Sequence, residues 1–452
     1  MTDLVVAGGT VVTPDGPRRA DLAVDYGRIE RIDAVLPHED VELIDATGLV
    51  VLPGVVDVHT HVRLSDAQHP DRFERDLRAA ARGGTTTVLT FNNPGTGISE
   101  HGSTGLLRGL DEFRERTAGR AAVDYGLCAV VTAQQPDALA ELPELIRRGV
   151  PTFKAFMVYD FAVDEDALPG LMRTAAQHGG MLMLHCEDPS VIDPLVADAL
   201  RRGEIGPRHH ASTRPVEAEA RATRRAIELA RRAEAPLYIV HLSCEAALEA
   251  VAEARERGEP VHAETCPQYL VLTQALYDVP DEAEVMKRVI SPPLRARSDV
   301  DALWAGLREG ILEVVSSDHV PDRADTEKRL PAPPFPEISN GAPGIETLLS
   351  VVYSEGVAAG RIGLERLVEV LASTPARLFG LASKGALEPG RDADFVLWDP
   401  GARRTLTQAD LHHSSDFTPY EGMVVTGALR ATLLRGRLVG DRAGRFLERR
   451  LT

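Results

Sequence analysis

The sequence predicts an α/β protein: a (β/α)8 TIM barrel with a small β-sandwich domain built from both chain ends. From Pro53 onward, eight apolar runs alternate with longer amphipathic stretches that are rich in Ala, Arg and Glu. Eight repeats of strand and helix over roughly 250 residues match a barrel. Before and after that region, short strand-like segments alternate with Gly, Pro and Asp, which is typical of a β-domain.

The two chain ends share the strand-and-turn pattern. The first 52 residues contain "LVVAGGTVVT", "ADLAVDYGRIERI" and most of "VELIDATGLVVLP", with no segment of helical period. The same style returns after Lys384, in "GALEPGRDADFVLWDP" and "MVVTGALRATLLRGRLVG". We therefore expect residues 1–52 and 387–452 to form the small domain together, with the barrel of residues 53–386 inserted between them.

The eight expected barrel strands are short and apolar. They are "VVDVHTHV", "TTTVLTF", "DYGLCAVV", "TFKAFMV", "MLMLHCE", "PLYIVHLS", "PVHAETCP" and "ILEVVSSDH". A doubly wound open sheet is the alternative, but it would not explain why polar residues repeatedly fall at the C-terminal ends of these runs. A long Pro-rich segment, residues 322–344, follows the eighth run and is a candidate substrate-side loop.

Composition and charge narrow the class of protein. The net charge of −18 over 452 residues argues against nucleic acid or an anionic membrane as partner, though not against a small anionic substrate. No run approaches 18 apolar residues and no signal-like segment opens the chain, so we expect neither a membrane span nor export. Four widely spaced cysteines indicate a reduced, cytoplasmic protein without disulfides.

Six side chains with ligand chemistry lie within or at the ends of five of the eight runs. They are His59, His61, Lys154, His185, His241 and Asp318. The C-terminal strand ends of a barrel converge on one mouth, so these side chains should meet there. A single histidine is more often a core or rim residue, but four histidines and an aspartate suit two divalent ions, zinc first and manganese second.

Lys154 is unusual because it stands inside a buried strand, where an unpaired ammonium is costly. A salt bridge to a nearby carboxylate is one explanation. The other is covalent: a neutral amine adds CO2 and becomes N6-carboxylysine, an anion that can bridge two metal ions. We favour the second explanation because it removes the charge and supplies a bridging ligand.

Asp318 is the expected general base and acid, since a carboxylate beside the metals can take a proton from water and pass it to a leaving nitrogen. His319 lies on the opposite strand parity and is not expected to be a ligand. We expect the remaining histidines to be solvated: His69, His101, His178, His209, His210, His412 and His413.

The motifs "DVHTH", "FKAFMVYD", "MLMLHCED", "IVHLSC", "AETCPQYL", "SPPLR", "SSDH" and "NGAPGIET" resemble those of the cyclic amidohydrolases. That group includes hydantoinase, dihydropyrimidinase, allantoinase and dihydroorotase, and the resemblance covers nearly the whole chain. It implies a hydrolase of carbon–nitrogen bonds in cyclic amides, other than peptide bonds. A metal-bridging hydroxide would open a hydantoin or dihydropyrimidine ring to an N-carbamoyl amino acid.

The resemblance also implies roles for single residues. His59, His61 and Asp318 would hold one metal ion, His185 and His241 the other, and carboxylated Lys154 would bridge them. Tyr159 would stabilise the oxyanion through its hydroxyl. Backbone groups at Ser291 and Asn340 would hold the cyclic amide. A homo-oligomer, tetramer or dimer, is expected from the resemblance alone.

The loop after His61 departs from the hydantoinase pattern. It reads "VRLSDAQHPDRF", shorter and more polar than the usual apolar stretch. Arg63 resembles the arginine that dihydroorotases use to grip a substrate carboxylate, and Asn93 could align with their carboxylate-binding asparagine. An ion pair of Arg63 with Asp66 or Glu74 is the competing interpretation.

Two other functions stay open on the sequence. One is a dihydroorotase- or allantoinase-like hydrolase of a carboxylated or ureido-substituted ring, with the same chemistry on a different small cyclic amide or imide. The other is a non-catalytic scaffold related to these enzymes. All six ligand positions are filled here, which disfavours the scaffold.

Overall fold

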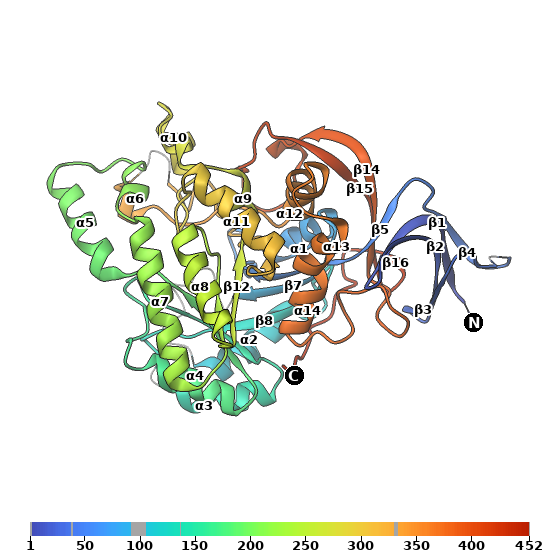
Figure 1. The fold of residues 1–452 in the computed structure, drawn as a ribbon, viewed down its shortest axis with the longest axis horizontal. Helices are drawn as coiled ribbons and strands as arrows, with labels where there is room; N and C mark the ends of the chain where they lie inside the picture. The colour runs from blue at the N-terminus through green and yellow to red at the C-terminus, as the bar shows by residue number, and fades with distance from the viewer. Residues whose placement is uncertain (1, 38, 92–104, 136, 330–332, 452) are drawn as a thin grey trace.

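The computed structural model describes residues 2–37, 39–91, 105–135, 137–329 and 333–451. It contains two sheets of eight strands each, one parallel and one mixed. In Figure 1 the N-terminal strands (blue) lie beside the C-terminal strands (red) at one end of the molecule, and the helices surround the parallel sheet at the other. The predicted combination of a barrel with a sheet from both chain ends is confirmed.

The parallel sheet is the barrel, and its strands follow one another in chain order. They are β6 (Val55–Thr60), β7 (Thr85–Phe91), β8 (Asp124–Val130), β9 (Thr152–Phe156), β10 (Met181–His185), β11 (Leu237–Ile239), β12 (Val261–Thr265) and β13 (Val314–Val315). A bridge between Thr60 and His319, with the His61 N–H donating to the His319 carbonyl at 2.7 Å, joins the segment just after the last strand to the first strand. The barrel is thereby closed, and the doubly wound alternative is wrong.

Burial on both faces explains why these strands read as apolar runs. Every residue of β7 and of β8 is buried. A strand of a parallel sheet is covered by helices outside and by other side chains inside, so it has no solvated face on which polar residues would alternate. Each of the eight expected runs contains one of the eight strands.

The helices follow the strands and cover the outside of the barrel (Figure 1). The α-helices are α1 (Arg72–Arg82), α2 (Leu106–Thr117), α3 (Ala138–Arg147), α4 (Leu168–Gln177), α5 (Pro189–Arg201), α6 (His209–Ser212), α7 (Val216–Ala233), α8 (Glu245–Glu256), α9 (Pro267–Val271), α10 (Glu282–Met286), α11 (Arg297–Glu309), α12 (Leu348–Val352), α13 (Leu364–Val368) and α14 (Thr374–Leu378). Short 3-10 turns lie at η2 (Gln274–Tyr277), η3 (Phe335–Glu337) and η6 (Gln408–Asp410), and π-helical turns at η4 (Tyr353–Ala358) and η5 (Glu369–Ser373). Among the described residues, none of these helices combines the length and the hydropathy that a bilayer span requires.

The mixed sheet combines both ends of the chain in the order β16-β15-β14-β5-β1-β2-β3, with β4 beside β1. The strands are β1 (Leu4–Thr13), β2 (Gly16–Asp25), β3 (Arg28–Asp33), β4 (Glu42–Asp45), β5 (Val50–Pro53), β14 (Phe395–Thr405), β15 (Val424–Leu434) and β16 (Arg437–Leu438). The pairing of β14 with β5 joins the two ends, because Phe395 lies opposite Pro53 and Trp398 opposite Val50.

Buried charges fasten the mixed sheet to the barrel. Nζ of Lys384 lies 2.5 Å from a carboxylate oxygen of Asp124, at the start of β8, and 2.6 Å from one of Asp394, just before β14. The C-terminal tail adds Arg449, whose buried guanidinium donates to the carbonyls of Leu127 and Phe379. These contacts lie at the N-terminal end of the barrel, and they leave the opposite mouth free for chemistry.

Candidate metal centre

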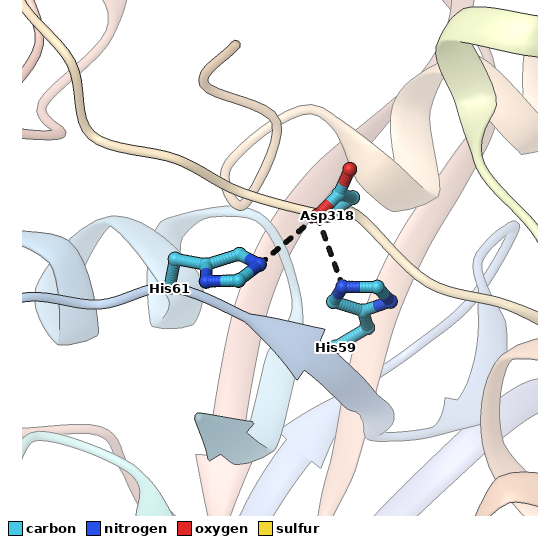
Figure 2. Close-up of side chains that lie close together, drawn as sticks. All are labelled: His59, His61 and Asp318. Carbon is cyan, nitrogen blue, oxygen red and sulfur yellow. Dashed lines mark ion pairs between the residues drawn. The ribbon is translucent and has the colours of Figure 1, made fainter. Parts of the chain in front are cut away.

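The histidines of the first barrel strand and the aspartate after the last strand meet at the mouth. In Figure 2 the rings of His59 and His61 both point toward Asp318. Nε2 of His59 lies 3.0 Å from Oδ1 of Asp318, and Nε2 of His61 lies 3.4 Å from the same oxygen. Three ligand atoms within 4.8 Å of one another can hold one divalent ion.

His241 and His185 extend this group across the mouth. The ring centroid of His59 lies 5.5 Å from that of His61 and 5.4 Å from that of His241, and His241 and His185 are 4.6 Å apart. Nδ1 of His241 is buried and has no hydrogen-bond partner in the described part of the chain. Four imidazoles in a row, one with an orphaned buried nitrogen, fit a pair of metal ions better than a single one.

Lys154 lies on β9 beneath this row and is 1% exposed. Its Nζ is 3.5 Å from Nε2 of His59 and lies over the rings of Phe91 and Phe156, 4.7 and 5.2 Å from their centroids. Within the described residues no carboxylate forms an ion pair with it. Burial lowers the pKa of Lys154 to about 8. The salt-bridge explanation for this lysine therefore finds no partner there.

Glu264 is a site residue that the sequence interpretation missed. One carboxylate oxygen contacts Nδ1 of His59 and accepts the backbone N–H of His241 at 3.3 Å; the other accepts the hydroxyl of Tyr238 at 2.9 Å. A carboxylate on Nδ1 keeps the proton there and leaves the lone pair of His59 on Nε2, where it could bind a metal ion. The available signal was an acidic residue inside the apolar run "PVHAETCP".

The protonation states of His61 and Asp318 suit metal ligation. Burial lowers the pKa of His61 to about 4, so its imidazole is neutral at pH 7. Burial acts to raise the pKa of Asp318, but the charge of His59 and hydrogen bonds from His59 and His61 hold it well below its usual range. A neutral imidazole and an ionised carboxylate are the forms that bind divalent metals.

Strained backbone collects at the mouth. Tyr159, His241 and Asp318 have φ angles of 85°, 38° and 48°, in the left-handed region that non-glycine residues rarely adopt. Each such residue costs about 1–3 kcal/mol, and the surrounding structure must over-determine it. Three strained residues around one mouth indicate that the positions of these side chains are maintained at a cost in stability.

The residues expected to hold the substrate ring lie together. Oγ of Ser291 donates to Oδ1 of Asn340 at 3.3 Å and lies 3.2 Å from Nε2 of His210. The Tyr159 hydroxyl interacts with Ser291 as well, and the tyrosine ring lies 5.5 Å from that of His185. The expectation that His210 is solvated is wrong: it is 3% exposed, and the fold buries it against the chain before Ser291.

Arg63 is engaged by acidic residues from the segment after the last strand. Its Nη1 lies 2.8 Å from a carboxylate oxygen of Glu327, and its Nη2 contacts the fully buried carboxylate of Asp322. The competing interpretation, an ion pair, is correct in kind but wrong in its partners, Asp66 and Glu74. Residues distant in sequence pair with Arg63 because the loop after β13 folds back over the mouth.

Three other expectations have different outcomes. Asn93 lies outside the described residues, so its role stays a prediction. His319 faces away from the row formed by His59, His61, His185 and His241. Its Nδ1 accepts the Gly344 N–H at 3.2 Å, and its Nε2 lies 3.6 Å from Asp76. His413 was expected to be solvated but is 1% exposed, packed near His319.

Comparisons with known proteins agree with this geometry. The model of the Amidohydrolase family matches residues 50–439. The chain belongs to the amidohydrolase family. It is 40% identical to a D-hydantoinase of Streptomyces coelicolor, over 96% of this chain and 94% of the relative, and 39% identical to a D-hydantoinase of Ralstonia pickettii, over 99% of each.

Comparison with solved structures supports the same family assignment. A crystal structure of dihydropyrimidinase from Brevibacillus agri superposes with a TM-score of 0.93 at 38% identity, covering 100% of this chain and 99% of the other. Near-complete coverage of both chains means that the barrel and the mixed sheet match together. The resemblance that the motifs predicted is therefore confirmed at the level of the family and the fold.

Proposed function

We propose that this amidohydrolase is a cyclic amidase that opens a hydantoin or dihydropyrimidine-type ring to an N-carbamoyl amino acid. The observation that carries the proposal is the row of four imidazoles with Asp318 and Lys154 at the barrel mouth. The names of the relatives, D-hydantoinase and dihydropyrimidinase, support the same reaction. A complete ligand set disfavours a non-catalytic scaffold.

Two divalent ions, zinc or manganese, would be held by this set. His59, His61 and Asp318 are proposed for the first ion and His185 and His241 for the second, with Lys154 between them. When bound, such ions lower the pKa of a water and polarise a carbonyl. The neutral imidazole of His61, the ionised Asp318 and the orphaned Nδ1 of His241 support this assignment.

Lys154 is proposed to carry CO2 as a carbamate. With a pKa near 8, about one lysine in ten is neutral at pH 7, against about one in three thousand at the ordinary pKa of 10.5. The neutral amine attacks CO2, a nitrogen–carbon bond forms, and one proton leaves to solvent. The product is an anion. It replaces an ammonium that forms no direct ion pair within the described residues, although the charges of Asp318 and Glu264 act on it from a greater distance.

The chain's own residues would then carry the proton and the charge. Asp318 takes a proton from the attacking water and delivers it to the ring nitrogen that leaves. The Tyr159 hydroxyl donates to the oxygen that becomes an oxyanion. Backbone groups at Ser291 and Asn340, which their side-chain hydrogen bond brings together, hold the ring.

The ring substituent is proposed to be uncharged. The dihydroorotase-like alternative needs a free arginine for a substrate carboxylate, and Arg63 is already neutralised by Asp322 and Glu327. Two acidic groups beside it would also repel a second carboxylate. Carboxylate binding by Arg63 and Asn93 stays a prediction, and the environment of Arg63 weighs against it.

The remaining features of the proposal concern the whole protein. Residues 1–52 and 387–452 are proposed as one domain and 53–386 as the other. A cytoplasmic location is proposed, supported by four cysteines that are free and buried. A homotetramer or homodimer is proposed from the family resemblance alone.

The test is a Lys154→Ala variant beside the wild type. Purified without chelator, the wild type should contain about two divalent ions per chain and open hydantoin or dihydrouracil. The variant should lose most metal and activity, and short-chain carboxylic acids should restore part of both by occupying the bridging position. Wild-type protein with neither metal nor activity after zinc or manganese and bicarbonate are added would refute the proposal, and a fully active variant would refute the bridging role.

A further inference from the structure

A carboxylate two residues after His185 determines which ring nitrogen that histidine can offer. Oε2 of Glu187 lies 2.7 Å from Nε2 of His185, and Glu187 is fully buried. An ionised carboxylate only accepts hydrogen bonds, so Nε2 must carry the proton. The lone pair is then on Nδ1, the reverse of His59, whose Nδ1 faces Glu264.

The same oxygen of Glu187 accepts a hydrogen bond from Nη1 of Arg214, also at 2.7 Å. Arg214 is itself held in place: its carbonyl accepts from Nη1 of Arg295 at 2.6 Å, and Arg295 pairs with buried Glu219 at 2.9 Å. The contact with Arg295 therefore fixes the backbone of Arg214, and Glu187 fixes its guanidinium. Its side chain is 10% exposed and has no role in the proposed ring-opening steps.

The guanidinium of Arg214 also lies against the tyrosine expected to stabilise the oxyanion. Its Cζ is 5.2 Å from the ring centroid of Tyr159, within the range of a cation–π contact. Tyr159 has a strained φ of 85°, so its position depends on the side chains packed around it. One guanidinium thus touches both the support of a metal ligand and the ring of the tyrosine.

We propose that Arg214 is a positioning residue that couples the two halves of the site. Through Glu187 it orients His185 so that Nδ1 faces the second metal ion, and through its planar face it holds Tyr159 over the reacting carbonyl. The inference rests on the proposed function, and it adds two residues, Arg214 and Glu187, to the machinery.

The experiment separates the two contacts with three variants and a control. Glu187→Gln should weaken binding of one of the two metal ions by about 10–100-fold, measured as metal retained against a competing chelator, with the other ion unaffected. Arg214→Lys keeps the charge beside Glu187 and loses the planar face, so it should retain both ions but lose kcat with little change in KM. Arg214→Met should show both defects.

The control is Arg221→Met, an exposed arginine on α7, the helix that begins two residues after Arg214; it pairs with Asp188 and should change neither readout. In a Tyr159→Phe background, Arg214→Lys should cause little further loss of kcat, because both changes disable one interaction.

Arg214 and Glu187 variants that retain both ions and match Arg221→Met in kcat would overturn the inference while leaving the proposed function intact. If the losses of kcat from Arg214→Lys and Tyr159→Phe are fully additive, the proposed positioning of Tyr159 by Arg214 is wrong. A wild type without metal or ring-opening activity would overturn the proposed function as well. If Arg214→Met does not fold, the metal retention of Glu187→Gln and the kcat of Arg214→Lys still decide the two arms.

Discussion

Replacing Lys384 by Met should expose how much the buried charges contribute to joining the mixed sheet and the barrel. Nζ of Lys384 is 2.5, 2.6 and 2.9 Å from carboxylate oxygens of Asp124, Asp394 and Asp392. Methionine keeps most of the aliphatic stem and removes only the ammonium. Asp124 retains Arg435 at 2.5 Å, but Asp394, 4% exposed, forms no other ion pair within the described chain.

The magnitude follows from that one uncompensated carboxylate. Removing one partner of a buried ion pair costs about 3–5 kcal/mol, and we expect about 3 kcal/mol because only Asp394 loses its sole cation. Burial already raises the pKa of Asp394 in the presence of Lys384. Without the lysine this pKa rises further, so the deficit is largest at pH 7 and shrinks toward pH 5, where the carboxyl takes up a proton.

The assay is urea unfolding at pH 7 and pH 5, with Lys287→Met as the matched control. Lys287 is a partly exposed lysine paired with Glu284 at i,i+3, a contact worth less than about 1 kcal/mol. Adding Asp394→Asn to Lys384→Met should recover part of the loss. The reasoning is refuted if Lys384→Met costs no more than Lys287→Met, or if its deficit grows on acidification.

Three further outcomes are expected. Arg63→Met should reduce turnover of neutral and carboxylated hydantoins by similar factors, because the arginine neutralises Asp322 and Glu327. A selective loss of more than tenfold on carboxylated rings would support the dihydroorotase-like alternative. Arg449→Met removes four hydrogen bonds from a buried guanidinium, one of them to the Cys128 thiol, and should cost about 2–4 kcal/mol in urea unfolding. Exposed Arg450→Met should cost almost nothing, and equal losses would contradict this expectation. Burial lowers the pKa of His413 to about 3, so on acidification the unfolded chain takes up a proton before the folded chain does, and the free energy of unfolding falls below about pH 6.5. His413→Gln should reduce the fall in unfolding free energy between pH 6 and pH 5 by about 1 kcal/mol, and an unchanged pH dependence would contradict this.

The sequence predicted the parts of this protein that local pattern encodes. Eight buried strands read as apolar runs because a parallel sheet has no wet face, and both chain ends read as strands separated by turn residues. Polar residues at strand ends predicted that the candidate metal ligands would lie close together, since barrel topology brings those ends together wherever they fall in the chain. Lys154 was conspicuous because a lysine rarely stands inside a buried strand.

Other features needed the folded chain. Glu264 and Glu187 looked like ordinary acidic residues, and only their contacts with His59 and His185 show which ring nitrogen of each histidine faces a carboxylate. His210 was expected in solvent, yet the chain before Ser291 covers it. Nothing in its local sequence encodes that cover.

What the sequence determined by itself is the barrel, the sheet built from both chain ends and the set of candidate metal ligands, because periodicity and residue type are local and strand order then follows from topology. Only the tertiary structure decided which side chains contact one another. Arg63 meets Asp322 and Glu327 across some 260 positions, and Arg214 lies between Glu187 and Tyr159. The sequence gives the charge of each side chain. The effect of that charge depends on which opposite charge lies within 3 Å, and only the packing of the folded chain sets that distance.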